Sequence, residues 1–316
     1  MTEWLTEAAT ARPGALAAAD RERRLSYAEL HAAAVARVAS LRADGLRSGD
    51  LHPIAGAVVQ PLAVAPSASN VLETLTGDGL RDVRGETGAL ARVLTSGTSG
   101  EPKPVLLTRE NFEASARASA ARLGVEQADR WLCCLPLNHV GGLSILVRSA
   151  IYGTAAVIEP RFELDRAAAL IDSGEVTVAS LVPTQLVRLL DADAPLDRPR
   201  LLLVGGGPLR PEVLEEALGR GATVVQTYGL TEACSQVCTL GPEEARERAG
   251  SAGRPLDGTE VRIDEDEILV RGPTVAPGAV SADGWLHTGD VGRLDRDGYL
   301  WAEGRRDDRI RPGGGN

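Results

Sequence analysis

The segment Leu201-Leu-Leu-Val-Gly-Gly-Gly-Pro208 is typical of a fully buried strand that ends in a glycine turn. A helix is predicted after it over Pro211–Leu218, and a second apolar strand over Thr223–Gln226. Upstream, the strand Thr177–Leu181 is followed by Pro183, which suits the first turn of a helix. The repeated order of strand, turn and helix predicts an α/β fold whose parallel sheet is covered by helices on both faces. Ligands of such sheets bind beyond the carboxyl ends of the strands.

The N-terminal part of the chain is predicted to begin with helix. Much of the first 45 residues has this character, and Ser26 with Glu29 fits a capping box at a helix start. Further on, Ala91–Leu94 and Val105–Leu107 are predicted strands on either side of a glycine-rich turn. A helix is expected from about residue 109, with Thr108 as its N-cap.

After Gly253 the pattern changes to short strands without helices. The hairpin turn Asp295-Arg-Asp-Gly298 supports a small antiparallel region there. The predicted strands are Val261–Ile263, Glu267–Val270, Gly292–Leu294 and Tyr299–Ala302. We therefore expect one large domain over 1–304, with an α/β part to about 252 and a β-region over about 253–304.

The composition excludes several classes of function. The 316 residues include 43% hydrophobic ones, enough for a sizeable core. The formal net charge of −10 argues against a nucleic-acid binder, because phosphate backbones require a basic face. The longest uncharged stretches are interrupted by Pro, Gly and Asn, so no membrane insertion is expected. Four cysteines without a zinc or disulfide spacing, and no visible secretory signal, predict buried free thiols in a cytoplasmic protein.

The strongest chemical motif is Leu94-Thr-Ser-Gly-Thr-Ser-Gly-Glu-Pro-Lys103. Its glycines allow a tight turn whose backbone N–H groups and hydroxyls can surround phosphate oxygens, and Lys103 adds a positive charge. The motif lacks the G-K-[S/T] ending of a Walker A loop. The candidate phosphate ligands are Thr95, Ser96, Gly97, Thr98, Ser99 and Gly100.

Two further motifs complete a nucleotide site. In Gln226-Thr-Tyr-Gly-Leu-Thr-Glu232, directly after a predicted strand, Tyr228 could stack on a base and Thr231 could donate to a phosphate. Glu232 could ligate Mg²⁺, which prefers oxygen ligands shared with phosphates. In Trp285-Leu-His-Thr-Gly-Asp290, an aspartate at a turn could accept two ribose hydroxyls, and Arg305 downstream could add a donor.

These three motifs, in this order, resemble the adenylate-forming superfamily of acyl-CoA synthetases, luciferases and peptide-synthetase adenylation domains. The resemblance covers most of the chain from Ala91 onward. It implies that ATP and Mg²⁺ bind here and that coenzyme A is a co-substrate. It also implies a role for each matching residue. Gly205, Gly206, Gly207 and Pro208 would face the base on the side opposite Tyr228 and Gly229. The catalytic residues would be Lys103, Thr231, Glu232 and His139. Asp290 and Arg305 would bind ribose, and Asp307 would be a hinge.

Within that superfamily the chain is most similar to the o-succinylbenzoate–CoA ligases of menaquinone biosynthesis. Three segments carry the similarity: 131–148, Ser180-Leu-Val-Pro-Thr-Gln185 and 226–236. The resemblance implies that His139 borders the acyl pocket and that Arg148 recognises the free carboxylate of a dicarboxylic substrate, because a charged group must be paired when it is buried. The residues expected around the acid are His139, Gly141, Arg148, Ser180, Thr227 and Gln236.

Two departures from the family are visible. First, only Leu51–Ala55 stands where the family carries a strand and a helix. Second, residues 305–316 would be a hinge and the start of the family's small C-terminal domain, which is expected to be absent from this chain. The expected activity is adenylation of the acid followed by thioester formation, and it is expected to be impaired because that domain acts as a lid over the site. Two alternatives remain open: a ligase for another aryl or acyl acid, or a nucleotide-binding fragment without catalysis. A homodimer is compatible with the sequence.

Overall fold

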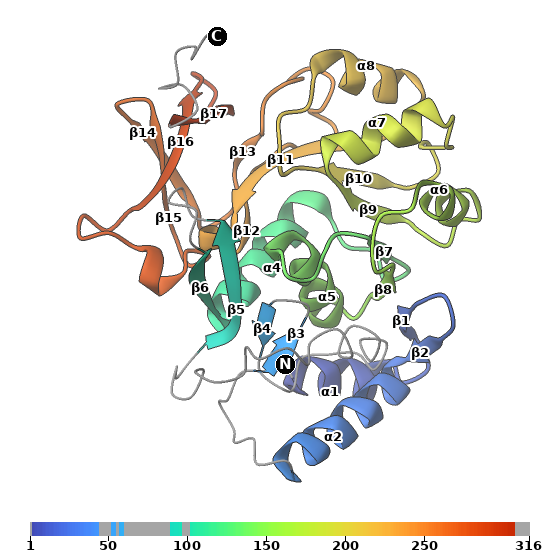
Figure 1. Cartoon of the computed structure of the whole chain (residues 1–316). Coiled ribbons are helices and arrows are strands. Elements are labelled where there is room, and N and C mark those ends of the chain that lie inside the picture. The colour runs from blue at the N-terminus through green and yellow to red at the C-terminus, as the bar shows by residue number, and fades with distance from the viewer. Residues whose placement is uncertain (1, 44–51, 55–56, 60–88, 97–101, 307–316) are drawn as a thin grey trace, which may run out of the picture.

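The computed structural model describes residues 2–43, 52–54, 57–59, 89–96 and 102–306. Three sheets organise this part of the chain (Figure 1). The largest has nine strands in the order β13-β12-β11-β10-β9-β7-β8-β1-β2, and the two others have four strands each. The expected mixed α/β architecture, with a parallel sheet between helices and a smaller antiparallel region, is confirmed.

The described helices include those that the sequence predicts, with starts near residues 27, 109, 183 and 211. They are α1 (Thr2–Ala11), α2 (Tyr27–Ala43), α4 (Arg109–Leu123), α5 (Val140–Tyr152), α6 (Leu164–Asp172), α7 (Pro183–Asp191) and α8 (Pro211–Gly219). At the start of α2, the backbone N–H and hydroxyl of Ser26 donate to the Glu29 carboxylate, and the Glu29 N–H donates back to the Ser26 hydroxyl. At the start of α4, Thr108 and Asn111 form a capping box. Both predicted N-caps are therefore confirmed.

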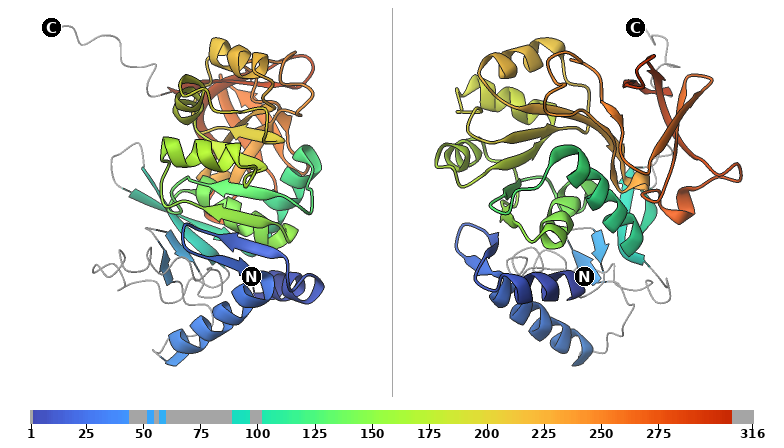
Figure 2. Two further views of the ribbon diagram at one scale, coloured as in Figure 1. Left: turned by 90° about the vertical axis from the view of Figure 1, so that its right-hand side faces the viewer. Right: turned by 180° about the vertical axis from the view of Figure 1, so that it is seen from behind.

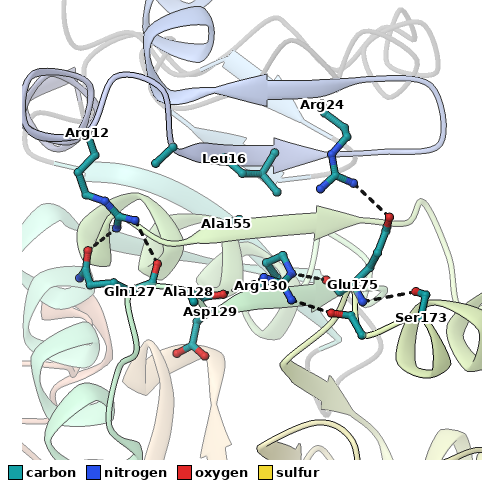
Figure 3. Close-up of a pocket in the computed structure, with 12 residues that line it drawn as sticks. Arg12, Leu16, Arg24, Gln127, Ala128, Asp129, Arg130, Ala155, Ser173 and Glu175 are labelled. Atoms are coloured by element: carbon teal, nitrogen blue, oxygen red, sulfur yellow. Dashed lines mark hydrogen bonds and ion pairs between the residues drawn. The ribbon is translucent and has the colours of Figure 1, made fainter.

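The strands of the large sheet are mainly parallel in its centre. They are β1 (Leu16–Ala19), β2 (Arg24–Ser26), β7 (Arg130–Cys133), β8 (Ala155–Ile158), β9 (Val178–Leu181), β10 (Leu201–Val204), β11 (Val224–Leu230), β12 (Ser235–Thr239) and β13 (Arg254–Pro255). β1 pairs in parallel with β8 near the sheet edge shown in Figure 3. β11 first pairs in parallel with β10 and then, over Thr227–Leu230, antiparallel with β12.

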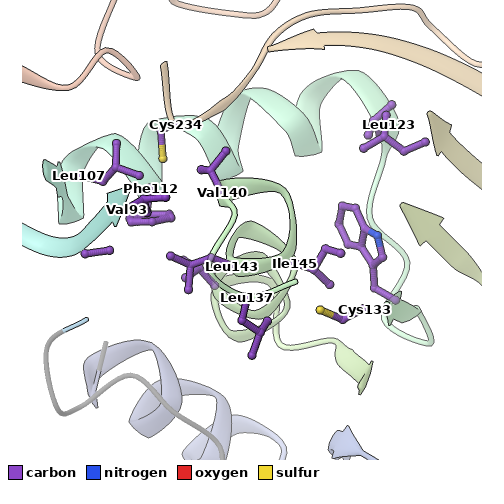
Figure 4. Close-up of a cluster of buried hydrophobic side chains, with 14 of the residues drawn as sticks. Val93, Leu107, Phe112, Leu123, Cys133, Leu137, Val140, Leu143, Ile145 and Cys234 are labelled. Atoms are coloured by element: carbon purple, nitrogen blue, oxygen red, sulfur yellow. The ribbon is translucent and has the colours of Figure 1, made fainter. Parts of the chain in front are cut away.

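The sheet is apolar on both faces because helices cover both. Leu201 and Leu203 of β10 lie in a core with α4 and α5, whose members include Phe112, Leu143 and Ile145 (Figure 4). Leu202 and Val204 lie in a second core, with α6, α7 and α8. Alternate residues of a strand point to opposite faces, so a strand buried on both faces needs the continuous apolar run that this segment shows. Figure 2 shows these layers from two other directions.

The two smaller sheets flank the large one. The first contains β3 (His52–Ile54), β4 (Ala57–Val59), β5 (Ala89–Ser96) and β6 (Pro102–Thr108). The second contains β14 (Glu260–Asp264), β15 (Glu267–Arg271), β16 (Leu286–Leu294) and β17 (Leu300–Arg305), all antiparallel. The 3₁₀ turns η2 (Thr231–Ala233) and η3 (Pro277–Ala279) both pack against β6. The hairpin predicted at 295–298 joins β16 to β17, with the Gly298 N–H bonded to the Asp295 carbonyl.

Candidate functional site

A cavity of about 370 Å³ lies at the carboxyl end of β10 and beside β11, where the rule for parallel sheets places ligands. Its other wall comes from β16 and β17 of the small sheet. Eight residues singled out from the sequence line it: Gly206, Gly207, Pro208, Thr227, Tyr228, Gly229, Asp290 and Arg305. The fold therefore brings together three motifs that are separated by up to about 100 residues in sequence.

Hydrogen bonds connect the polar side chains of this pocket. The Tyr228 hydroxyl donates to Oδ2 of Asp290 at 2.7 Å, and Nε of Arg305 lies 3.1 Å from Oδ1 of the same carboxylate. Burial raises the pKa of Tyr228, and the negative charge of Asp290 raises it further. The phenol therefore stays protonated as a donor, and both carboxylate oxygens keep lone pairs for additional donors.

Glycines bring the backbone close to the cavity. Gly206 has φ +77°, a conformation that side chains disfavour. At Gly205 a Cβ atom would lie 2.7 Å from Cγ2 of Thr227, and at Gly229 it would lie 1.6 Å from the carbonyl oxygen of Ser235. These contacts explain why small residues are required where β10 ends and where β11 passes β12.

Two local expectations were wrong. The segment Gln226–Leu230 lies within β11 and does not follow it, because β12 supplies hydrogen-bonding partners that prolong the strand. Asp290 lies in a bulge inside β16 and not at a turn. In this bulge Glu267 and Leu269 of β15 face Val291 and His287. The residues between the latter two therefore have no regular partner in β15, although Asp290 pairs with Arg305 on β17. A bulge changes the direction of a side chain while the strand continues, and this one is consistent with the inward direction of Asp290.

The expected phosphate side is built from β6 and η2, which pack together. Lys103 is exposed on β6 and pairs in register with Thr95 on β5, whose hydroxyl donates to the Lys103 carbonyl at 3.3 Å. Thr231 and Glu232 are half-buried in η2, outside the lining of the cavity. The predicted ligands Gly97, Thr98, Ser99 and Gly100, the hinge residue Asp307 and the Ser96 side chain lie outside the described part of the structure.

The expected acid-binding residues fall on three elements. His139 is exposed at the N-cap of α5, and Gly141 lies in the first turn of that helix. Ser180 of β9 is buried, and its hydroxyl accepts from the indole N–H of Trp131 at 3.0 Å. Gln236 of β12 is also buried and connects this region to the cavity, because its amide N–H₂ approaches the Thr227 hydroxyl at 3.5 Å.

Arg148, the predicted carboxylate ligand, is buried between α4, α5 and β12, and only 3% of it is exposed. Its Nη2 donates to the Ser115 hydroxyl at 3.0 Å, and this hydroxyl donates to the Cys234 carbonyl at 2.8 Å. Nε of Arg148 and Oε1 of Gln236 are buried without a hydrogen-bond partner in the described part of the chain. Burial lowers the pKa of Arg148, since the charged form is deprived of solvent.

Several residues of the cavity were not anticipated. Gly250, Ala252, Ala302, Glu303 and Gly304 line it alongside the predicted ones. Oε1 of Gln226 accepts from the Gly250 N–H at 3.0 Å, which fixes the loop after β12 against β11. The position of 302–304 beside Arg305 could have indicated three of them, whereas Gly250 and Ala252 belong to no chemical motif.

Other features of the described residues bear on chemistry. All four cysteines are buried and free, as expected, and burial raises the pKa of both Cys134 and Cys234 to about 12, so they are unreactive thiols. Within the described ranges, no group of three or more His, Cys, Asp or Glu side chains could hold a metal ion. In the same ranges, no helix is long and apolar enough to cross a membrane.

Comparison with known proteins gives consistent results. The profile of the AMP-binding enzyme family matches residues 87–279. A 2-succinylbenzoate–CoA ligase from Listeria monocytogenes is 39% identical over 276 residues, covering 83% of this chain and 59% of the relative. The corresponding ligase from Bacillus licheniformis is 43% identical over 245 residues, covering 70% and 51%. The chain thus spans only about half the length of these curated relatives.

Solved structures agree with the sequence relatives. The o-succinylbenzoate coenzyme A synthetase from Bacillus subtilis in complex with AMP superposes with a TM-score of 0.81 at 31% identity, covering 96% of this chain and 98% of that one. The same enzyme in complex with its acyl-adenylate intermediate gives a TM-score of 0.80, covering 96% and 78%. The family profile, the relatives and the geometry of the pocket agree: this chain belongs to the AMP-binding enzyme family.

Proposed function

We propose that this chain carries the nucleotide- and acid-binding site of an o-succinylbenzoate–CoA ligase of menaquinone biosynthesis. In the first half-reaction one carboxylate of the acid attacks the α-phosphorus of ATP, giving an acyl-adenylate and pyrophosphate. In the second half-reaction the thiol of coenzyme A attacks the activated carbonyl and releases AMP. The observation that carries the proposal is the cavity that unites Tyr228, Asp290 and Arg305, in a chain similar over 96% of its length to a synthetase solved with AMP.

The cavity suits the adenosine part of the nucleotide. The glycine turn at 205–207 leaves room for the flat face of a base, and the ring of Tyr228 provides an opposing surface. The Asp290 carboxylate can accept from two ribose hydroxyls, since each of its oxygens has one donor in the structure and capacity for another. Arg305 would add a donor on the same side.

The phosphates would extend towards β6 and η2. Lys103 and the Thr231 hydroxyl would bind phosphate oxygens and place the α-phosphorus in line with the attacking carboxylate. Glu232 fits a Mg²⁺ site, because its carboxylate has no ion-pair partner in the described residues and Mg²⁺ typically takes one or two carboxylates besides phosphates and water. When bound, Mg²⁺ supplies charge neutralisation between the two anions.

The proposed binding site for the acid is supported by the buried guanidinium of Arg148. Arg148 has no carboxylate partner among the described residues, and its Nε is buried there without a hydrogen-bond partner. A dicarboxylic acid would provide the missing negative charge when its second carboxylate enters. A ligase for a monocarboxylic aryl acid would leave Arg148 without that partner, and for this reason the dicarboxylate is favoured. His139 and Gly141, at the start of the same helix, would border the acyl group.

The deciding experiment is calorimetric titration with non-hydrolysable acyl-adenylate analogues of o-succinylbenzoate and of benzoate. Tight binding that prefers the succinylbenzoyl analogue is the expected result. Asp290→Asn should weaken both analogues equally, whereas Arg148→Met should weaken only the succinylbenzoyl one. Equal affinity for both analogues in the unmodified chain would refute the substrate assignment, and no binding of either would favour a degenerate fragment.

The proposal extends to the location of the protein. A cytoplasmic site is supported by the four free cysteines, because oxidising compartments favour disulfides. A homodimer is the oligomeric form we propose to test, by sedimentation of the chain with and without the adenylate analogue. A single monomeric species under both conditions would refute it.

A further inference from the structure

A second cavity, of about 410 Å³, lies away from the nucleotide pocket. Arg130 and Ala155, the first residues of β7 and β8, line it, so it is located at the amino ends of the parallel strands. The nucleotide pocket is located at the carboxyl end of β10, on the opposite edge of the same sheet. A ligand in the second cavity would therefore not compete with the nucleotide.

Three arginines converge on this cavity from different parts of the sequence. Figure 3 shows that Arg12 and Arg24 extend from the N-terminal side of the cavity, Arg12 towards Gln127 and Arg24 towards Glu175, while Arg130 lies on the opposite side. Arg24 pairs with the Glu175 carboxylate at 3.2 Å. The other acidic residue in the lining, Asp129, already accepts two hydrogen bonds from Arg200.

Arg12 and Arg130 bond only to uncharged oxygens in the described residues. Arg12 donates to the Gly153 carbonyl at 2.9 Å and to both oxygens of Gln127. Arg130 donates to the carbonyls of Gly174 at 2.6 Å, of Glu175 at 2.9 Å and of Ala128 at 3.2 Å. Each guanidinium has five N–H donors, so each retains two without a described acceptor.

The balance of charge leaves this cavity positive. Arg24 offsets Glu175, and Arg200 offsets Asp129. Among the carbonyl acceptors of Arg12 and Arg130, Gly153 is the C-cap of α5 and Gly174 follows the C-cap of α6, and each of these helix ends contributes about half a negative charge. About one positive charge therefore remains at the cavity, in a chain whose formal net charge is −10.

We propose that this cavity is a binding site for a small oxyanion, a carboxylate or phosphate group carried by a molecule of metabolite size. The unused guanidinium N–H groups of Arg12, Arg24 and Arg130 would donate to its oxygens, in the forked arrangement that arginine offers to such groups. The site is independent of the nucleotide pocket and of the proposed ligase activity.

The test is titration calorimetry of the whole chain at low ionic strength with inorganic phosphate and, separately, with succinate. Saturable binding of at least one anion is expected, and Arg24→Gln should raise its dissociation constant at least tenfold, on the order of one charge-assisted contact. Arg24 is an exposed surface residue, so this variant should fold. Arg130→Gln should have the same effect on binding, with circular dichroism as the check on its fold.

Two control variants identify the site. Arg220 also donates to a carbonyl at a helix end, that of Leu190, but lies outside the cavity, so Arg220→Gln should bind the anions unchanged. Arg305→Gln alters the nucleotide pocket and should also leave anion binding unchanged. Absence of saturable binding, or binding lost in Arg305→Gln and retained in Arg24→Gln, would overturn the proposal. The anion with the lower dissociation constant, phosphate or succinate, shows whether the ligand carries a phosphate or a carboxylate group.

Discussion

Replacing Arg148 by methionine should keep or increase the stability of the protein while reducing its affinity for the proposed substrate. Arg148 is 3% exposed, and its only hydrogen bond from the side chain to a described residue is the one to Ser115. Removing an ion from water costs several kcal/mol even after relaxation, and no carboxylate offsets that cost here. Methionine has a similar length and no charge, so the substitution removes this penalty.

The magnitude follows from two opposing contributions. Loss of the bond between the guanidinium and the Ser115 hydroxyl should lower the free energy of unfolding by about 1.5 to 3 kcal/mol. Relief of the desolvation penalty should raise it by a comparable or larger amount. We therefore expect a change between about 0 and +2 kcal/mol, with the Ser115 hydroxyl still bonded to the Cys234 carbonyl.

The assay is urea unfolding of the unmodified chain, Arg148→Met, Ser115→Ala and the double variant. Ser115→Ala should be destabilising by about 2 to 4 kcal/mol, because it leaves a buried donor of Arg148 and the Cys234 carbonyl unpaired. The loss should be smaller in the Arg148→Met background, where only the carbonyl loses its partner. Binding of the succinylbenzoyl-adenylate analogue should weaken by about 2 kcal/mol or more, which is about 30-fold.

One result would refute this reasoning. If Arg148→Met lowers the free energy of unfolding by more than about 3 kcal/mol, the arginine stabilises the fold by itself. Its burial would then need no ligand as an explanation. A stable variant that binds the succinylbenzoyl and benzoyl analogues with unchanged affinity would refute the role in the site.

Three further predictions concern other parts of the chain. Gly229→Ala should lower the free energy of unfolding by about 3 kcal/mol or more in urea titrations, because its Cβ would overlap the Ser235 carbonyl; a loss below about 1 kcal/mol would contradict the geometry. Hydrogen bonds to Glu267 and then Asp283 raise the pKa of His287, so its contribution to stability should be complete below its unfolded-state pKa of about 6.5 and be lost as pH rises through the folded-state value. Melting temperatures of the protein and of His287→Gln should therefore differ at about pH 6 and converge at about pH 9, and a difference that grows with pH would be inconsistent with this sign. The four cysteines should react with a thiol reagent only after unfolding, and rapid labelling of the native chain would contradict their burial.

The sequence predicted those features that depend on local chemistry. The capping residues Ser26 and Thr108 mark helix starts because their side chains satisfy backbone donors that the helix leaves open. The continuous apolar run at 201–204 indicated a strand buried on both faces. The meeting of Tyr228, Asp290 and Arg305 was inferred from the resemblance to a family, since no local rule relates positions so far apart.

Features that depend on tertiary pairing could not be predicted. β11 extends beyond Gln226 because β12 returns beside it, and the bulge at Asp290 depends on the register between β15 and β16. The burial of Arg148 was suggested only by the resemblance to a family, because an arginine on a helix is usually solvated. The second cavity draws on Arg12, Arg24 and Arg130, which share no motif and become neighbours only because β1 pairs with β8.

The change of partners along β11 has a consequence for how the protein folds. Its first half needs β10 beside it and its second half needs β12, while the facing wall of the nucleotide pocket is formed by β16 and β17. The contact between β11 and that wall joins Tyr228 to Asp290, which are 62 residues apart, and such a long-range contact forms slowly because a large loop must close first. We expect the capacity to bind nucleotide to appear last during refolding, after most helical structure has formed. Nucleotide binding during refolding would therefore detect chains that have reached the native state, and not chains that have only collapsed.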